Sequence, residues 1–122
     1  MAEGFSRFEN RDLEFLRRAV GEANVSVEES ELLIHAIDSF PSEWVKPDVV
    51  IWPENTEQVS TILRYANERK LPIVPRGAGS SLAGNVLPVQ HGIVLNFRKM
   101  SSILKILDRD LQVVVQPGVV YD

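Results

Sequence analysis

The sequence contains no cysteine, and this absence excludes disulfide bonds, thiolate metal ligands and a cysteine nucleophile. It also lacks a long apolar run, because no stretch reaches the roughly 20 apolar residues that a membrane-spanning helix needs. The first residues, MAEGFSRFENRDLEF, carry charges throughout and do not have the pattern of a secretory signal. We therefore expect a cytoplasmic protein.

An excess of basic residues is lacking as well. The chain has 13 Lys and Arg against 17 Asp and Glu, which gives a formal net charge of −4, and no local basic cluster reverses it. A nucleic-acid partner is therefore not expected, since such proteins carry a basic surface. With 122 residues, of which 44% are apolar and 25% charged, the composition is that of one modest globular domain.

Two helices are predicted near the N-terminus. Apolar residues recur at helical spacing over residues 11–22, with charges on the opposite side. Ser26 and Glu29 form a capping-box pattern ahead of a second apolar stripe, which predicts a helix over residues 27–38 that ends before Pro41.

A strand–helix–strand pattern follows. The apolar run DVVIWP at 48–53 predicts a strand buried on both faces, and IVP at 73–75 predicts another. Between them, Asn55 is a helix-capping residue and predicts a helix over 55–69. This order predicts a βαβ unit with parallel strands and a right-handed crossover. The helix is expected to bury Val59, Ile62, Leu63 and Ala66.

Three further apolar runs, at 92–97, 103–108 and 111–116, predict an antiparallel meander. The expected fold class is α+β, with N-terminal helices, a βαβ parallel unit and then the meander. We divide the chain into an N-terminal helical segment, 1–45, and a second unit, 46–122.

A glycine-rich loop follows the second predicted strand. Its sequence, VPRGAGSSLAGN (74–85), has three glycines, two serines, Arg76 and no acidic residue. Small side chains let backbone N–H groups approach a ligand closely, and such donors beside a cation suit phosphate or pyrophosphate. The loop leaves the carboxyl end of a parallel strand, where α/β sheets bind ligands. The alternative is that the glycines only turn the chain.

Neither common phosphate motif matches this loop. The dinucleotide fingerprint G-x-G-x-x-G fails because Leu82 stands where the third glycine is required. Gly79 and Gly84 satisfy the P-loop spacing, but Asn85 then occupies the position of the essential lysine. A Rossmann NAD site and a P-loop NTPase are therefore both unsupported.

Four motifs occur in order over residues 46–122: P-D-x-V-x-x-P, P-x-x-P-R-G-x-G-S-S-L-x-G, G-I-V-L with M-x-x-I-L-x-I behind it, and V-x-V-Q-P-G-V. Through them the chain resembles the opening of the FAD-binding domain of the p-cresol methylhydroxylase and vanillyl-alcohol oxidase superfamily. The branch that contains glycolate oxidase and D-lactate dehydrogenase is most similar. The resemblance implies an FAD-dependent enzyme that oxidises a small 2-hydroxy acid, such as glycolate or D-lactate, by hydride transfer to the flavin.

The resemblance also implies which residues bind FAD. The main pyrophosphate cradle would be Arg76, Gly77, Ala78, Gly79 and Ser80, continued by Ser81, Gly84 and Asn85, while Pro117 and Gly118 would approach the flavin. From the residues alone, Pro117 and Gly118 favour an ordinary strand-ending turn. Relatives that attach FAD covalently have a histidine where this chain has Ser80, so non-covalent FAD is implied.

Other chemistry-bearing side chains give weaker signals. His35 and His91 have no second ligand at a metal-binding spacing, so both are expected to be structural or solvent-facing, and no metal site is predicted. Trp44 and Trp52 are expected to be packing residues rather than stacking platforms for a ligand. No catalytic residue is assigned.

Members of the resembled family run to several hundred residues, so the chain resembles a fragment. We expect the isolated chain to be inactive and to hold FAD weakly or to lack it, with the 2-hydroxy acid bound by the missing region. Apolar strands that no other strand covers predict a homo-oligomer. The longer enzyme of which this chain would be a part, here called the parent, is expected to work with partner subunits of an oxidase complex. Peripheral contact of that complex with a membrane is an alternative. The alternative is a non-catalytic scaffold or interaction module whose glycine loop is only a turn.

Overall fold

The computed structural model describes residues 4–121 of the chain. Its helices are α1 (Asn10–Val20), α2 (Glu29–Ile34) and α3 (Thr56–Arg69). Its strands are β1 (Val25–Ser26), β2 (Val49–Ile51), β3 (Ile73–Arg76), β4 (Ile93–Asn96), β5 (Ile103–Leu107) and β6 (Gln112–Val115). Single turns of 3-10 helix are η1 (Glu22–Asn24), η2 (Phe97–Lys99) and η3 (Asp108–Asp110).

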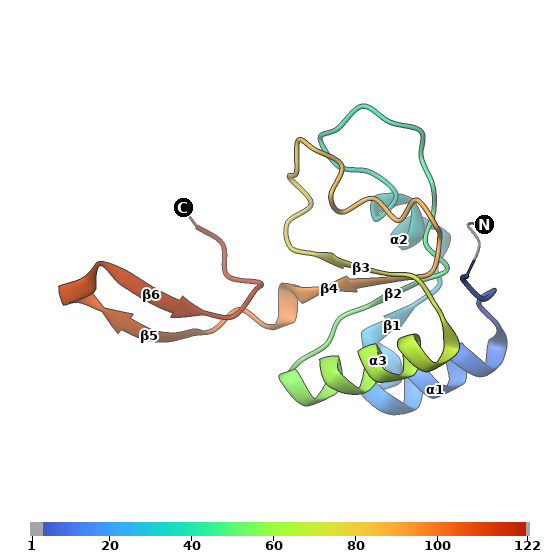
Figure 1. Cartoon of the computed structure of the whole chain (residues 1–122), viewed down its shortest axis with the longest axis horizontal. Coiled ribbons are helices and arrows are strands. Elements are labelled where there is room, and N and C mark those ends of the chain that lie inside the picture. The colour runs from blue at the N-terminus through green and yellow to red at the C-terminus, as the bar shows by residue number, and fades with distance from the viewer. Residues whose placement is uncertain (1–3, 122) are drawn as a thin grey trace.

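The main sheet has the strand order β1-β2-β4-β3. β4 runs parallel to both β2 and β3, with Val94 opposite Val50 on one side and Val74 on the other, and β1 is antiparallel to β2. Helices α1 and α3 cover one face of this sheet, whereas α2 and two long loops lie over the other (Figure 1). This mixed arrangement confirms the α+β fold class.

The sheet differs from the expected connectivity at β4. We expected this strand to open an antiparallel meander, but it inserts between β2 and β3, and the antiparallel part is limited to the β5–β6 hairpin. All four residues of β4 are buried. A strand with no exposed side suits the centre of a parallel sheet that is covered on both faces.

Helix α3 forms largely as predicted. The Asn55 side chain accepts a hydrogen bond of 2.9 Å from the Gln58 backbone N–H, and Lys70 ends the helix in the left-handed conformation at φ 57°. Ile62 is fully buried, but Leu63 is 45% exposed, so the expectation that Leu63 is buried is wrong. The sheet covers only a narrow stripe of the helix, and Leu63 lies about 100° round the axis from Ile62.

Helix α2 is shorter than the predicted 27–38. Ser26 pairs with Val50 as part of β1, and its hydroxyl accepts from the Glu28 N–H within a local turn instead of capping a longer helix. The helix therefore begins at Glu29. Trp44, in the loop that follows, is 69% exposed, so the expectation that it is a packing residue is wrong.

The core joins the N-terminal segment to the sheet. Leu16 and Val20 of α1 and Val25 of β1 belong to the same buried cluster as the sheet and α3 residues. The remaining members of this cluster are Val49, Ile51, Ile62, Ala66, Leu71, Ile93 and Leu95. Residues 1–45 and 46–122 thus share one hydrophobic core in the described part of the chain.

A buried carboxylate links α1 to α3. Asp12 accepts hydrogen bonds from the Tyr65 hydroxyl (2.6 Å), from Arg69 Nε (2.8 Å) and from the Glu9 backbone N–H (2.8 Å). Burial opposes ionisation of Asp12, but these hydrogen bonds and the charge of Arg69 outweigh it and hold the pKa of Asp12 below its ordinary 3.8. The pair of helices is therefore stabilised by the ionised form of Asp12.

This linkage predicts a loss of stability in acid. A carboxyl group whose pKa is lowered by folding contributes stability above its unfolded pKa and loses it as the pH falls through the folded value. We expect Asp12→Asn to lower the free energy of unfolding by about 1–3 kcal/mol at pH 6. Between pH 4 and pH 2, the stability of this variant should depend less on pH than the stability of the wild type. Urea unfolding at stepped pH measures both. The control is Glu14→Gln, at an exposed position on the same helix, and its stability should change with pH as that of the wild type does. If Asp12→Asn lost as much stability in acid as the wild type, the stabilising role of ionised Asp12 would be contradicted.

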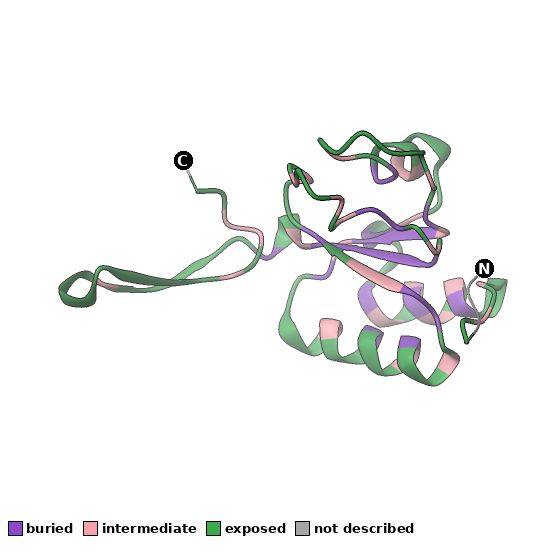
Figure 2. Ribbon diagram, turned by 45° about the horizontal axis from the view of Figure 1, so that its top comes forward, coloured by how far each residue is buried: buried purple, intermediate pink, exposed green. Residues whose placement is uncertain are grey.

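The β5–β6 hairpin extends away from the rest of the molecule (Figures 1 and 2). Its apolar side chains are exposed, including Ile103, Leu104, Ile106, Leu111, Val113, Val114 and Val115. Within residues 4–121, no helix has the length and apolar character to cross a membrane.

Candidate cofactor site

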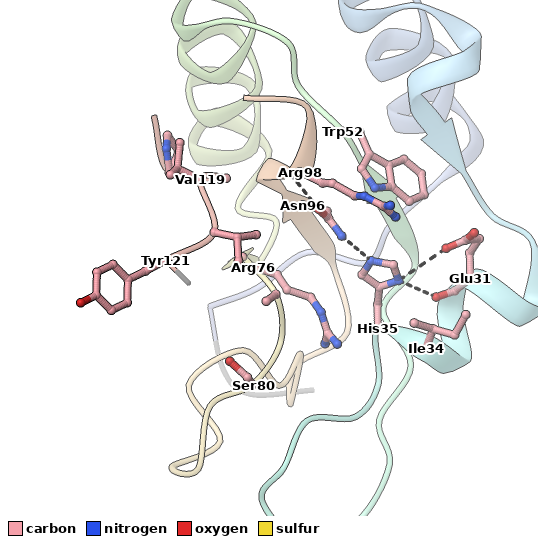
Figure 3. A pocket seen from close by; sticks show the side chains of 15 residues that line it. Glu31, Ile34, His35, Trp52, Arg76, Ser80, Asn96, Arg98, Val119 and Tyr121 are labelled. Carbon is pink, nitrogen blue, oxygen red and sulfur yellow. Dashed lines mark hydrogen bonds and ion pairs between the residues drawn. The ribbon is translucent and has the colours of Figure 1, made fainter. Parts of the chain in front are cut away.

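A cavity of about 720 Å³ lies at the carboxyl ends of the parallel strands β3 and β4 (Figure 3). Arg76 and Asn96 end these strands and line it, and Trp52, just after β2, lines it as well. Residues of α2 and of the chain after β6 complete the wall. Volumes of this size hold ligands of cofactor size, and the carboxyl edge of a parallel sheet is where such ligands bind.

Six of the ten predicted site residues line the cavity, and four do not. Those that line it are Arg76, Gly77, Ala78, Ser80, Pro117 and Gly118. Those outside its lining are Gly79, Ser81, Gly84 and Asn85. The structure thus brings the start of the glycine loop together with the Pro117-Gly118 segment, which are separated by about 40 residues in the sequence.

Arg76 is the buried cation of the site, with 7% of its surface exposed. Its Nη1 donates a hydrogen bond of 2.8 Å to the Ile37 carbonyl, which joins β3 to the loop after α2. Burial lowers the pKa of Arg76 below its ordinary value, and the nearby Asp38 opposes that effect. The guanidinium is charged at neutral pH, as arginine side chains in proteins are. A Cβ at Gly79 would lie 2.2 Å from Nη2 of Arg76, so Gly79 leaves the room that this side chain occupies.

The loop presents backbone donors. In the described part of the chain, the N–H groups of Ala78, Gly79 and Ser80 donate no hydrogen bond to another residue. Further along, the Ser81 hydroxyl accepts from the Ala83 and Asn85 N–H groups and closes the loop on itself. The first half of the loop can therefore bind an anion, whereas the second half shapes the turn.

Two glycines of the site differ in the space around them. A Cβ at Gly118 would lie 2.0 Å from the Phe97 carbonyl oxygen, so this glycine lets the chain after β6 pass directly over η2. A Cβ at Gly77 would meet only the Pro117 carbonyl oxygen, at 4.0 Å. Gly118 thus has a packing role in addition to lining the cavity, while Gly77 lines the cavity and has open space beside its Cα.

Sequence reasoning missed several residues of the cavity wall: Glu31, Ile34, His35, Trp52, Asn96 and Arg98. A signal existed for Asn96, because it is a polar residue at the end of a continuously buried strand. None existed for His35, since only the fold brings residues of α2 to the end of β4. As expected, His91 is exposed, where its Nδ1 lies 2.9 Å from the Lys46 carbonyl oxygen.

The donor set fits FAD. A pyrophosphate is bound by backbone N–H groups and fixed cations. Ala78, Ser80 and Arg76 supply both where they line the cavity, and the Gly79 N–H lies between Ala78 and Ser80 in the same loop. Gly77 lines the cavity, and a Cβ there would meet no atom nearer than the Pro117 carbonyl oxygen at 4.0 Å, so the backbone at this point is open to a close approach.

Comparison with known proteins agrees with this geometry. A family model described as FAD binding domain matches residues 47–122. The glycolate oxidase subunit GlcD of Bacillus subtilis is 39% identical over 107 residues, a match that covers 88% of this chain and 23% of that protein. The probable mitochondrial D-lactate dehydrogenase of Danio rerio is 34% identical over 103 residues, covering 84% of this chain and 21% of that one.

The fold is also similar to a solved structure. A crystal structure of p-cresol methylhydroxylase with substrate bound superposes with a TM-score of 0.82 and 29% sequence identity, over 98% of this chain and 24% of that one. This chain spans about a quarter of the length of these relatives. Since the family model covers more than half of the chain and FAD fits the site, FAD is the cofactor of this domain. The chain belongs to the FAD binding domain family.

Proposed function

We propose that this chain forms the pyrophosphate-binding part of the FAD site of an oxidoreductase that oxidises a small 2-hydroxy acid of the glycolate or D-lactate class. The observation that carries the proposal is the cavity at the ends of β3 and β4, with a buried arginine and free backbone donors on one edge. The substrate class rests on the names of the relatives, glycolate oxidase and D-lactate dehydrogenase.

The residues of this chain hold and orient the cofactor. Arg76 neutralises one phosphate while the N–H groups of residues 78–80 bind phosphate oxygens, and Pro117 and Gly118 line the cavity beside Gly77. When bound, FAD supplies the hydride acceptor. Ser81, Gly84 and Asn85 support the loop from outside the cavity. No residue of this chain is proposed as catalytic, and the hydroxy acid is proposed to bind to other parts of the parent enzyme.

A comparison of ligands tests the cradle. Isothermal titration calorimetry with FAD, FMN and riboflavin should show a binding affinity that decreases in that order. The affinities for FAD and riboflavin should differ at least about tenfold, equivalent to about 1.4 kcal/mol. Weak absolute affinity is expected, because these residues supply only part of a cofactor groove. Acid precipitation should release all flavin, since Ser80 replaces the histidine of covalent relatives. Equal affinity for FAD and riboflavin would contradict a pyrophosphate cradle and favour the alternative of a scaffold whose loop is only a turn.

We further propose that the exposed hairpin pairs with a second copy of the chain. β5 and β6 form a two-stranded sheet, so each has an unpaired edge, and their side chains are apolar and exposed. Light scattering at micromolar concentration should give twice the chain mass. The variant Ile106→Lys with Val113→Lys changes a cross-strand pair of the hairpin and should give a monomer. Leu63→Lys, an exposed position on α3, is the control, and a monomeric wild type would contradict the proposal.

The remaining proposals concern the parent enzyme. We propose that it works in the cytoplasm with partner subunits of an oxidase complex, and peripheral contact of that complex with a membrane is the alternative. Fractionation of cells that produce the parent enzyme, followed by affinity purification, tests both statements.

A further inference from the structure

His35 lies between α2 and the end of β4, and only 3% of its surface is exposed. Its Nδ1 is 2.7 Å from the Glu31 carbonyl oxygen, and its Nε2 is 2.9 Å from Nδ2 of Asn96 (Figure 3). Asn96 Oδ1 accepts from the Arg98 backbone N–H at 3.0 Å, so the amide group that faces His35 is the donor. The ring therefore donates from Nδ1 and accepts at Nε2, which is the neutral form of histidine.

The contact joins one wall of the cavity to the sheet. None of the six residues of α2 is buried, yet Glu31 and Ile34 of this helix line the cavity. His35 follows the helix directly and connects it to β4 through Asn96. Since α2 has no buried side chain of its own, its position over the cavity depends on the residues at its end.

We propose that His35 is a positioning residue of the cofactor site, whose neutral ring joins α2 to β4 and holds the α2 wall over the cavity. This inference rests on the proposed function, since it assigns the cavity to FAD. Protonation of Nε2 would set an N–H donor against the Asn96 N–H donors, so the contact is lost in acid. FAD affinity then falls as His35 is protonated.

The charged groups around His35 influence the pH at which its ring is protonated. The Glu31 carboxylate lies 3.8 Å from Nδ1 and favours protonation, whereas Arg76 at the end of β3 disfavours it. Arg98 lines the same cavity from η2, and Asp38 lies close to Arg76. Burial lowers the pKa of His35 from its ordinary 6.5, the hydrogen bond to Glu31 opposes this, and Arg76 lowers the pKa further. The contact is therefore intact at neutral pH.

Trp52 reports on this contact without any cofactor. Its ring meets His35 edge to face, with centroids 5.8 Å apart and an interplanar angle of 86°. A protonated imidazole at such a distance quenches indole fluorescence. In a Trp44→Phe background Trp52 is the sole tryptophan, because the chain has two. We expect its emission to fall between pH 8 and pH 4.5 in one transition with a midpoint below 6.5.

Three variants identify the group that titrates. The transition should disappear in His35→Gln and persist in His91→Gln, which removes the other of the two histidines. Asn96→Asp keeps the shape of the side chain but presents a carboxylate to Nε2, so the midpoint should rise by about one unit or more. This variant retains His35 and therefore tests the contact even if His35→Gln folds poorly.

FAD affinity supplies the second measurement. Between pH 7.5 and pH 5 the FAD dissociation constant should rise at least about tenfold, or about 1.4 kcal/mol, in His91→Gln, and much less in His35→Gln. A flat Trp52 titration, a transition that survives His35→Gln, or an FAD affinity that stays level through the transition would overturn the proposal. Absence of FAD binding at every pH would instead overturn the proposed function, and the Trp52 transition with Asn96→Asp would then decide the His35–Asn96 contact alone.

Discussion

Replacing Ile62 with alanine is expected to lower the free energy of unfolding by about 2–5 kcal/mol. Ile62 is fully buried between α3 and the sheet, and it belongs to the same cluster as Leu16, Ile51 and Ile93. Truncation removes three buried carbon atoms and leaves a cavity that the surrounding structure fills only in part. For a domain of this length the loss corresponds to a melting temperature lower by roughly 8–20 °C, which differential scanning calorimetry measures.

The adjacent residue is a matched control for this prediction. Leu63 has a side chain of the same size on the same helix, but it is 45% exposed. Leu63→Ala should therefore cost well under half of what Ile62→Ala costs, because its side chain already contacts water in the folded state. Equal losses for the two variants would contradict the orientation of α3 on the sheet.

Replacing Gly77 with valine is expected to weaken FAD binding by at least about tenfold, or about 1.4 kcal/mol, with little effect on folding. A Cβ at this position meets no atom of the protein closer than the Pro117 carbonyl oxygen at 4.0 Å, so the folded chain accommodates a Cβ there. That space lies on the cavity wall, where we propose that a phosphate group approaches the backbone. A side chain therefore competes with the cofactor rather than with the core.

A graded series separates this effect from a general disturbance of the loop. Gly77→Ala should lose less affinity than Gly77→Val, and both should melt within a few degrees of the wild type. Ala83→Val changes the same loop outside the cavity lining and should bind FAD normally. Full FAD affinity in Gly77→Val would refute the cradle. A large loss in Ala83→Val would indicate that the loop responds as a whole.

Local sequence patterns predicted those parts of the fold that local interactions determine. Helix α3 begins one residue after the Asn55 cap and ends at Arg69, as expected from a capping residue and an apolar stripe. The pattern could not tell that Leu63 is exposed, because the width of the buried stripe depends on how the helix rests on the sheet. It also could not give the position of β4, since a fully buried strand has the same sequence pattern in either sheet arrangement.

The candidate site divides in the same way. The glycine loop and Arg76 were recognisable because small residues and a cation in one short stretch have a direct chemical meaning. His35 and Asn96 were not, because they are 61 residues apart and their contact exists only after α2 folds over the end of β4. Trp44 was expected to be a packing residue from its residue type alone, and its surroundings leave it exposed.

The central claim is that FAD binds with its pyrophosphate on the first half of the glycine loop. Amide chemical shifts measured by NMR during an FAD titration test it most directly, because Ala78, Gly79 and Ser80 have N–H groups without a partner in the described part of the chain. The largest changes are expected at these three amides and at Gly77 and Gly118, with none in the β5–β6 hairpin. ADP should reproduce the loop changes, since it carries the same pyrophosphate. Loop amides that stay fixed while FAD saturates the protein, or shifts confined to the hairpin, would contradict the account.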